Sequence, residues 1–465
     1  MKHIHFLGIG GSGTSAAAAI AQAQGFTVTG CDLKPHNEFT RTFKDSQLFT
    51  GHNPQHLVSQ SSNRNTDSDS KKVDILAVTP AIFSLDPNNS ELLEAKKQGI
   101  EIMIWQQFLG KYLVKDKFVI TVCGTHGKTT TTAMIAKILE DAKLDPTVEL
   151  GAITPWGGTN YKIGNGKYFV VEADEFNDNF LHLKPDINVI TNIEMDHPEY
   201  FENLEAVKDS FKKFLLQTKR VILANLSDSN VADILKVIMK TDICKHHKVK
   251  HDHKVKVKYL DYSKHKLNFS LKIPGTFNKL NAQAALQVGL ILGIKPETIQ
   301  KSLQNYQGVG KRFEYIGDCR GAKVYSDFGH HPTEIAKTME AAREKFPNQT
   351  ILLIYQPHMF ARTKALFSDF VRVFQNLPVD KVFIMDIYPS REVDTGLVTS
   401  QQLIEAIQKE VESKLRSGEK TIPPVKYVGN KDQVLEKIKP EIKKGDIVFF
   451  MSAGDTDELA KKLVG

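Results

Sequence analysis

Short apolar runs alternate with amphipathic helical patterns along the chain. In the first part, apolar runs at residues 3–7, 26–30, 73–79 and 100–104 predict strands, and the alanine-rich run 15–24 predicts a helix. The segment 59–72 between two of these strands is rich in Ser, Asn and Asp and has nothing to bury, so it is predicted to be a mobile loop. The pattern of this part therefore predicts alternating strands and helices.

The same alternation continues through two further parts. Strands are predicted at 118–122, 168–171, 187–191 and 221–224, with helices at 129–142 and 281–292, and later strands at 351–355, 381–386 and 446–451. Strands separated by helices are typical of parallel sheets. We therefore predict three consecutive α/β domains: a Rossmann-like domain at 1–113, a P-loop ATPase-like parallel sheet at 114–312, and a Rossmann-like domain at 313–465.

The composition is that of an ordinary soluble globular protein. Of 465 residues, 41% are hydrophobic and 25% are charged, and no apolar run is long enough to span a bilayer. No signal peptide is recognisable at the N-terminus, which indicates a cytoplasmic protein with no membrane partner. The four cysteines are widely separated and form no CxxC pair, which argues for reduced thiols and against disulfides or a zinc site.

Much of the net charge of +7 lies in one segment, residues 240–266, where Lys and His alternate with a few apolar residues. No aromatic residues are interleaved as a stacking platform, so we interpret the segment as solvated surface and predict no nucleic-acid partner. Adventitious metal binding is a minor alternative for its histidines, His246, His247, His251 and His253.

A glycine cluster follows the first predicted strand. Gly8-Ile9-Gly10-Gly11-Ser12-Gly13 matches G-x-G-x-x-G between a strand and a helix, and Asp32 ends the next strand. Such a turn lets the backbone approach a diphosphate, while the carboxylate binds a ribose hydroxyl. A NAD-dependent dehydrogenase fits this pattern, but a UDP-sugar carries the same two groups.

A second glycine turn, Gly124-Thr125-His126-Gly127-Lys128-Thr129-Thr130, also lies between a strand and a helix. It is a shortened Walker pattern, with Val122 where the full pattern has glycine. Its backbone amides would cradle phosphates, Lys128 would reach the β- and γ-phosphates, and Thr129 would coordinate Mg²⁺. Two phosphate-binding turns in one chain weaken the dehydrogenase interpretation.

Carboxylates and a histidine follow neighbouring strands of the predicted second sheet. Glu172 follows the strand 168–171, and Asp196-His197 lies just past the strand 187–191. Ligands gather at the carboxyl ends of parallel strands, so Thr129, Glu172 and His197 are predicted to share one metal–phosphate site. Mg²⁺ favours the oxygen ligands, whereas Mn²⁺ tolerates the histidine better.

These motifs, in this order, resemble the Mur ligase family of peptidoglycan synthesis. The resemblance extends to Glu172-Ala173-Asp174-Glu175, Asn192 to His197, Asn278 to Ala282, Gly310 to Phe313, Asp327 to Glu334, Tyr355 to His358 and Ala453-Gly454-Asp455. The stretches Gly329-His330-His331-Pro332-Thr333-Glu334 and Gln356-Pro357-His358 are most similar to the branch that joins L-alanine to UDP-N-acetylmuramate. The resemblance implies an ATP-dependent amide ligase that uses Mg²⁺.

The resemblance also implies roles for particular residues. It assigns catalysis to Lys128, Glu172, His197, Arg312 and Asp327; ATP to Gly124, Thr125, His126, Gly127, Lys128, Thr129, Thr130, Asn278, Asn281, Arg312 and Asp327; the UDP-sugar to Gly8, Gly10, Gly11, Ser12, Gly13, Asp32, Thr79 and Ala81; and the amino acid to His330, His331, His358 and Arg362. From the residues alone, the two asparagines could equally cap a helix near residue 281, and Arg312 could be a surface ion pair.

Three positions depart from the family pattern. Met359 stands where an arginine usually follows Q-P-H, although Arg362 is retained; Thr79-Pro80-Ala81-Ile82 replaces a serine-rich loop, and Ser452 replaces a common glycine. Because the arginines near Met359 are associated with the amino acid's carboxylate, the loss of one leaves the identity of that amino acid open.

The implied reaction activates the sugar-acid carboxylate as an acyl phosphate, which the amine then attacks. His197, His330 and His331 are candidates for the base, since histidine titrates near neutral pH, and the sequence does not choose among them. Domain closure would assemble the site, because Arg312 and Asp327 lie in a different predicted domain from the phosphate turn.

The alternatives are a sister ligase that attaches recycled tripeptide, a NAD-dependent dehydrogenase and a non-catalytic nucleotide-binding regulator. Oligomeric state and carbamylation of Lys212 or Lys213 stay open.

Overall fold

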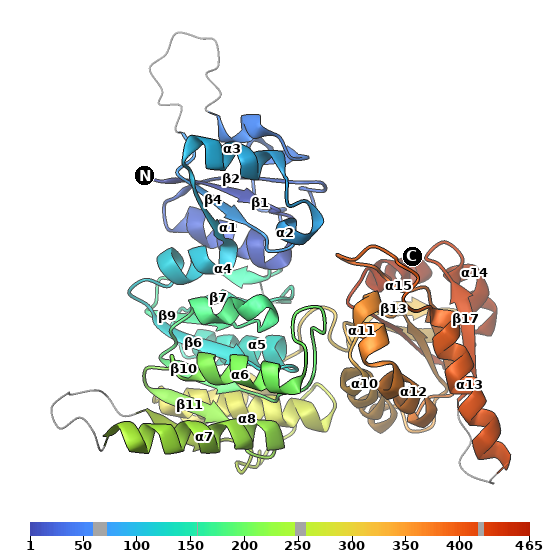
Figure 1. The fold of residues 1–465 in the computed structure, drawn as a ribbon. Coiled ribbons are helices and arrows are strands. Elements are labelled where there is room, and N and C mark those ends of the chain that lie inside the picture. The colour runs from blue at the N-terminus through green and yellow to red at the C-terminus, as the bar shows by residue number, and fades with distance from the viewer. Residues whose placement is uncertain (59–71, 156, 247–256, 417–422) are drawn as a thin grey trace. The chain divides into compact units, whose positions relative to one another are not determined.

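A computed structural model describes residues 1–58, 72–155, 157–246, 257–416 and 423–465 of the chain (Figure 1). The chain divides into two compact units. The first, unit 1, comprises Met1–Ile193, Lys208–Lys266 and Asn281–Leu303, and the second, unit 2, comprises Glu194–Val207, Leu267–Leu280 and Gln304–Gly465.

Unit 1 begins with a five-stranded parallel sheet in the order β3-β2-β1-β4-β5. Side chains alternate between the faces of a strand, so Leu7 packs toward α3 and the short helix η2, whereas Phe6 packs edge-on against Phe108 of α4. Figure 1 shows α3 on one side of this sheet and α1 on the other. The elements are β1 (His3–Leu7), α1 (Ser12–Ala23), β2 (Thr27–Asp32), η1 (Asp45–Gln47), β3 (Leu48–Thr50), η2 (Pro54–Leu57), β4 (Ile75–Val78), α2 (Ile82–Leu85), α3 (Ser90–Gln98), β5 (Glu101–Ile104), α4 (Trp105–Phe108) and η3 (Leu109–Leu113).

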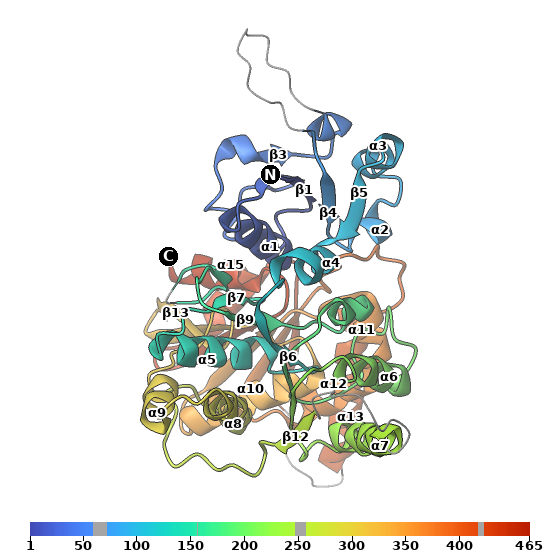
Figure 2. The same cartoon turned by 90° about the vertical axis from the view of Figure 1, so that its left-hand side faces the viewer.

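A seven-stranded sheet follows in unit 1, in the order β12-β11-β10-β6-β9-β7-β8, with only the last pair antiparallel. Figure 2 shows α5 and α8 on one face of this sheet and α6 and α7 on the other. The buried strands β6 and β9–β11 are almost continuously apolar, as expected when both faces of a sheet are covered. The elements are β6 (Phe118–Cys123), α5 (Lys128–Asp141), β7 (Thr147–Glu149), β8 (Tyr161–Lys162), β9 (Tyr168–Glu172), η4 (Phe176–His182), β10 (Ile187–Ile190), α6 (Leu204–Leu215), β11 (Val221–Ala224), α7 (Ser229–His246), β12 (Lys258–Asp261), α8 (Thr276–Ile291) and α9 (Pro296–Gln304).

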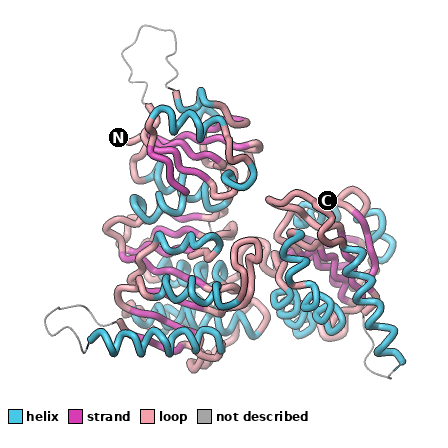
Figure 3. Tube along the Cα trace, in the orientation of Figure 1, coloured by secondary structure: helices cyan, strands magenta, loops and turns pink. Residues whose placement is uncertain are grey.

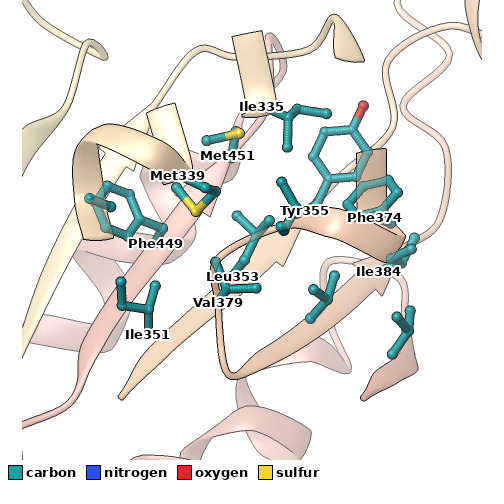
Figure 4. Close-up of a cluster of buried hydrophobic side chains, with 14 of the residues drawn as sticks. Ile335, Met339, Ile351, Leu353, Tyr355, Phe374, Val379, Ile384, Phe449 and Met451 are labelled. Atoms are coloured by element: carbon teal, nitrogen blue, oxygen red, sulfur yellow. The ribbon is translucent and has the colours of Figure 1, made fainter. Parts of the chain in front are cut away.

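The sheet of unit 2 has six strands in the order β13-β14-β18-β15-β16-β17, and only β13 runs antiparallel to its neighbour. One face packs Leu353 and Tyr355 of β15 against Met339 of α10 and Phe374 of α12 (Figure 4). The opposite face packs against α14 and α15. The elements are β13 (Glu314–Cys319), β14 (Ala322–Asp327), α10 (Pro332–Lys345), β15 (Ile351–Tyr355), α11 (Phe360–Ala365), α12 (Phe367–Asn376), β16 (Lys381–Met385), α13 (Ser400–Arg416), β17 (Val425–Gly429), α14 (Val434–Ile438), η5 (Lys439–Glu441), β18 (Ile447–Met451) and α15 (Thr456–Val464).

The predicted fold class is confirmed, since the three sheets are mainly parallel and helices separate their strands along the chain (Figure 3). One helix differs: α8 begins at Thr276, not near residue 281. Asn281 therefore lies inside the helix, and the alternative interpretation that it caps the helix start is wrong. The predicted domain boundaries stay a prediction.

Two expectations fall largely outside the described residues: the polar loop from residue 59 to 71, and most of the histidines of the basic segment. Within the part of the chain that the structure describes, no helix is long and apolar enough to cross a membrane.

Candidate active site

The turn between β6 and α5 brings backbone amides to the carboxyl edge of the seven-stranded sheet. Gly127 immediately precedes α5 with a φ of +85°, and Gly124 has a φ of +128°, both conformations that favour glycine. A Cβ atom added to Gly127 would lie 2.6 Å from Oδ1 of Asn281. The backbone therefore passes close to α8, and Asn281 lies beside the turn.

Lys128 folds back onto this turn. Its Nζ donates to the carbonyl oxygens of Gly124, at 2.7 Å, and Thr125, at 3.1 Å, and to Glu175 Oε2 at 2.8 Å. Burial opposes the charged form, but the carboxylates of Glu175, Asp174 and Glu172 raise the pKa of Lys128 above its usual value. The lysine is a fixed cation in the turn.

Thr129 and Glu172 lie together, as the sequence predicted. The Thr129 hydroxyl donates to Glu172 Oε1 at 2.9 Å, and the Gly151 amide donates to Oε2 at 2.8 Å. A hydroxyl oxygen beside a carboxylate is a donor set that suits Mg²⁺. His197, the third predicted ligand, belongs to unit 2.

Glu149 is a neighbour of this group that the sequence did not single out. It ends β7, it is 3% exposed, and its Oε2 has no hydrogen-bond partner. Burial first, and then the charges of Glu172 and Asp174, raise the pKa of Glu149 well above its usual value. Its surroundings therefore disfavour a second negative charge beside Glu172.

The end of β10 fixes the middle of the turn. Asn192 accepts the His126 amide at 2.9 Å through Oδ1, and it donates to the His126 carbonyl at 2.9 Å through Nδ2. The hydroxyl of Thr191 donates to the same carbonyl at 2.7 Å. Thr191 was missed, although its place at the end of the predicted strand 187–191 was a usable signal. Thr125 and Thr130 are both buried in or next to the turn.

The first glycine turn is held without any lysine. Asp32 Oδ2 accepts the Gly10 amide at 3.0 Å, and the Asn37 side chain donates to the Gly10 carbonyl at 3.0 Å. A Cβ added to Gly8 would lie 2.4 Å from the Thr79 side chain, so this part of the loop is close-packed. Asn37, which the sequence did not single out, brackets Gly10 together with Asp32.

The remaining residues assigned to the UDP-sugar lie around this turn. Gly11 precedes α1, and Ala81 precedes α2. The Ser12 carbonyl accepts a hydrogen bond of 2.6 Å from Asn160, and a Cβ added to Gly13 would lie 2.3 Å from Trp105. The carbonyl of Ser12 therefore ties the turn to the seven-stranded part of unit 1.

In unit 2, Arg312 and Asp327 lie near each other. Asp327 accepts the amides of Phe313 and Gly329, both at 2.8 Å, and Arg312 stacks over the Phe328 ring at 4.4 Å. Burial raises the pKa of Asp327, although the charge of Arg312 opposes this. Asp327 thus fixes the loop that follows β14, and Arg312 rests on an aromatic face.

His197 sits in a second polar group of unit 2. It adopts a φ of +54°, its amide donates to Asp196 Oδ1 at 2.8 Å, and its Nδ1 lies 3.2 Å from Glu199 Oε1. Arg362 Nε donates to the same Asp196 oxygen at 2.8 Å. Burial opposes the charge of Asp196, but the nearby His197 and Arg362 hold the pKa of this carboxyl group well below its usual value. A buried ion pair thus links two predicted site segments.

Arg362 also connects to the predicted amino-acid residues. Its Nη1 donates to His358 Nδ1 at 3.2 Å, and the His358 ring stacks on Tyr388 with centroids 5.6 Å apart. The His330 and His358 rings are 5.8 Å apart. Burial lowers the pKa of His330 to about 4 and that of His358 to about 2, so both are neutral at pH 7.

His331 has both ring nitrogens engaged. Nδ1 accepts the Thr333 amide at 3.2 Å and so caps α10, while Nε2 donates to the Met195 carbonyl at 3.1 Å. Met359 is buried with a φ of +73°, and its sulfur lies 3.9 Å from Arg362 Nη1. The thioether sulfur of Met359, a weak hydrogen-bond acceptor, therefore lies against the guanidinium of Arg362.

Asn278 and Asn281 both lie on α8. The Asn278 side chain donates to the Pro274 carbonyl at 2.7 Å, which anchors the start of the helix. Asn281 lies against the phosphate turn at Gly127. The structure thus brings Asn281 to the turn itself.

Three family models match the chain in succession. The model "Mur ligase family, catalytic domain" matches residues 3–116, "Mur ligase middle domain" matches 122–289, and "Mur ligase, glutamate ligase domain" matches 311–454. Together they span nearly the whole sequence.

Individual proteins are similar over the full length. The UDP-N-acetylmuramate–L-alanine ligase of Alkaliphilus metalliredigens is 34% identical over 485 aligned positions, covering 100% of this chain and 97% of the relative. That of Aquifex aeolicus is 33% identical, with coverage of 100% and 97%.

Two solved structures share the fold. The UDP-N-acetylmuramate-alanine ligase of Thermotoga maritima superposes with a TM-score of 0.72 at 25% identity, covering 100% of this chain and 98% of that one. A murein peptide ligase of Psychrobacter arcticus reaches 0.67 at 22% identity, with coverage of 100% and 98%.

Proposed function

Because the chain belongs to the Mur ligase family, we propose that it is an ATP-dependent ligase that joins L-alanine to UDP-N-acetylmuramate in peptidoglycan precursor synthesis. The observation that carries this proposal is the group formed by Lys128, Thr129 and Glu172 at the phosphate turn. The full-length similarity to L-alanine ligases supports the choice of amino acid. Such a reaction uses ATP and a UDP-sugar, which are found in the cytoplasm, and we place the protein there.

The reaction proceeds in two steps. A carboxylate oxygen of the sugar acid attacks the γ-phosphorus of ATP, the bond to the β–γ bridging oxygen breaks, and an acyl phosphate and ADP form. The neutral amine of L-alanine then attacks the acyl carbon, and the tetrahedral intermediate expels inorganic phosphate. One proton leaves the nitrogen, so a base is required.

The phosphate turn supplies binding and charge for the first step. The amides at the start of α5 point to the phosphates, and Lys128 exchanges its contacts with Glu175 for phosphate oxygens. Mg²⁺, held by Thr129, Glu172 and His197, would neutralise charge on the transferred phosphoryl group.

The first glycine turn is proposed to hold the UDP-sugar. Its amides receive the diphosphate, and Asp32 is the acceptor for a ribose hydroxyl. Gly8 and Gly10 keep the backbone free of side chains at the points where Thr79 and Asp32 already crowd it. Residues of both compact units take part in the one reaction.

Arg362 and its neighbours are proposed to receive the amino acid. Arg362 offers a guanidinium to the carboxylate, and His358 and His330 line the same group as neutral rings. Since both nitrogens of His331 are hydrogen-bonded, we assign it to positioning α10. His197 is proposed as a metal ligand, which leaves His330 as the candidate base. Arg312 and Asp327 are proposed to reach the nucleotide.

The test measures phosphate release from ATP with Mg²⁺ and UDP-N-acetylmuramate. L-alanine, glycine, L-serine and the tripeptide L-Ala-γ-D-Glu-diaminopimelate are supplied separately. Release that needs both the sugar acid and L-alanine supports the proposal. Release with the tripeptide alone would transfer the assignment to the recycling ligase, and tight NAD binding without ATP turnover would favour a dehydrogenase.

A further inference from the structure

A buried cluster of four possible metal ligands lies in unit 1, beneath the first glycine turn. His5 Nε2 or Nδ1, Cys31 Sγ, a His56 ring nitrogen and a Glu91 oxygen all lie within 4.8 Å of one another. His5 is on β1, Cys31 on β2, His56 on η2 and Glu91 on α3. Three of the four are fully buried, and His56 is nearly so. We propose that these four side chains form a structural zinc site.

The contacts within the cluster are short and converge on one carboxylate. Glu91 Oε1 accepts from Cys31 Sγ at 3.1 Å, from His56 Nδ1 at 2.9 Å and from the Asn53 amide at 2.8 Å. Glu91 Oε2 faces only His5 Nε2, at 3.2 Å. Neither of these two atoms makes a well-directed hydrogen bond, although both are shielded from solvent. Such buried polar atoms are rare, and a bound ion would satisfy both.

The geometry fits a small tetrahedral ion. With bonds of about 2.0–2.3 Å to zinc, neighbouring ligand atoms lie about 3.3–3.8 Å apart. His56 Nδ1 and Cys31 Sγ lie 2.9 and 3.1 Å from Glu91 Oε1, so these two distances would have to open by a few tenths of an ångström. His5 Nε2 approaches the other carboxylate oxygen, Oε2, at 3.2 Å, and one ligand atom from each of the four residues lies within 4.8 Å of the others.

The donor chemistry selects the metal class. Imidazole nitrogens with one thiolate favour Zn²⁺ over Mg²⁺ or Ca²⁺, which prefer oxygen. Two neutral imidazoles, one thiolate and one carboxylate bring a charge that cancels the dication, and a neutral site is cheaper to bury than an isolated ion. Without an ion, burial raises the pKa of the Cys31 thiol far above its usual value.

The surrounding residues orient the ligands. His5 Nδ1 lies 2.9 Å from the Thr29 hydroxyl, which leaves Nε2 turned to the cluster. The His56 ring stacks on Phe49, with centroids 4.5 Å apart and planes at 15°. His52 Nδ1 lies 3.3 Å from Cys31 Sγ, as a hydrogen-bond donor to a metal-bound sulfur would. Each ring is therefore fixed before a metal arrives.

The site would tie four elements to the first glycine turn. The Cys31 carbonyl accepts the amides of Gly8 at 2.8 Å and Ile9 at 3.1 Å. An ion bound by Cys31 would therefore restrict the motion of the end of β2, to which the glycine turn is hydrogen-bonded. The spacing of the cysteines gave no signal for this site, because its ligands come from four separate elements and include only one cysteine.

The experiment uses the full chain, stripped of metal with a chelator and titrated with Co²⁺ as a spectroscopic substitute for Zn²⁺. We expect a thiolate-to-cobalt charge-transfer band that saturates at about one equivalent, and Zn²⁺ should displace it. Zinc should also raise the temperature of unfolding of the stripped protein. No band in the native chain would overturn the proposal.

The variants distinguish this cluster from the His-rich segment, in which Cys244 precedes His246 and His247. C31S should abolish the band, and C244S should keep it; the reverse result would overturn the proposal. His56→Asn provides a second measurement should C31S fail to fold. It should weaken cobalt binding by at least about tenfold, and unchanged affinity would contradict the assignment.

Discussion

The two glycine turns of unit 1 share a backbone design and differ in charge. Each follows the middle strand of its sheet, β1 in the order β3-β2-β1-β4-β5 and β6 in the order β12-β11-β10-β6-β9-β7-β8, and each leads into a helix. In the first turn Asp32 accepts the Gly10 amide, with no lysine in the turn. In the second, Lys128 is paired with Glu175. Parallel topology supplies amides at both places, and the two turns differ in the side chain that contacts them, a carboxylate in the first and an ammonium group in the second.

The largest expected effect tests the cation of the second turn. Lys128→Ala should lower kcat by about a hundred- to a thousandfold, because a fixed charge at the transferred phosphoryl group is lost. Phosphate release under saturating substrates measures this. Lys137→Ala, which removes a lysine of the same helix paired with Asp141, is the matched control and should keep full activity. Comparable losses in both variants would contradict the role of Lys128.

The second test uses the buried carboxylates beside the two turns, whose pKa values move in opposite directions. Glu91 is near the first turn; burial opposes its charge, but His5 and other donors lower its pKa to about 2. Glu149 is near the second turn, and its pKa is raised, first by burial and then by the negative charge of Glu172. At pH 7 the ionised form of Glu91 stabilises the fold, whereas folding disfavours the ionised form of Glu149 and so costs stability.

In metal-free protein at pH 7, Glu91→Gln should therefore lower the free energy of unfolding by about 3 kcal/mol, and Glu149→Gln should raise it. The loss of stability in Glu91→Gln is fully present above pH 4.5 and disappears as the pH falls toward 2. The gain at Glu149 disappears as the pH falls to 4.5, its value in the unfolded chain. Urea unfolding at several pH values measures the free energy of unfolding of both variants. A change of the same sign in both variants at pH 7 would contradict the comparison.

The third test compares the glycines. Gly127→Ala puts a side chain at a φ of +85° and against Asn281, so it should cost about 1–2 kcal/mol of stability and weaken ATP binding. Gly11 has a φ of −71° and a nearest neighbour at 3.6 Å, so Gly11→Ala should cost less than about 1 kcal/mol. Chemical denaturation gives both values. A larger loss at Gly11 would show that the first turn is the more constrained.

The smallest expected effect is at Asp32. Asp32→Asn keeps one oxygen acceptor, so KM for the UDP-sugar should rise by about fivefold with little change in kcat, as expected for one weakened hydrogen bond. Asp45→Asn, at an exposed position of the same sheet region, is the control. A fall in kcat instead would mean that Asp32 acts on the chemical step.

Much of the fold was predictable, because short continuous apolar runs mark buried parallel strands. The buried strands β6, β15 and β18 were predicted to within one residue at each end. The antiparallel edge strand β13 was missed because it is partly exposed and carries no continuous apolar run. The strands β7 and β8 were missed because they are only three and two residues long. The start of α8 was placed five residues late, because Thr276 and Phe277 precede the regular pattern.

The site was predictable where one motif supplied neighbouring atoms. Thr129 and Glu172 follow adjacent strands of one sheet, and they meet. Pairings that depend on a rotamer or a distant segment left no local signal. Glu175 as the partner of Lys128 and Asp196 as the partner of Arg362 are of this kind. The cap that His331 forms on α10 is local, and Pro332 and Glu334 at the start of the helix were usable signals for it.

The central place of β6 has a consequence for the order in which the protein is made. Its two neighbours, β9 and β10, are completed only at residues 172 and 190, well after the glycine turn itself has been synthesised. A nascent chain released before residue 190 would hold the turn without the strand whose following residues, Thr191 and Asn192, fasten His126. The length of nascent chain at which ATP binding first appears would therefore show when β10 has paired with β6.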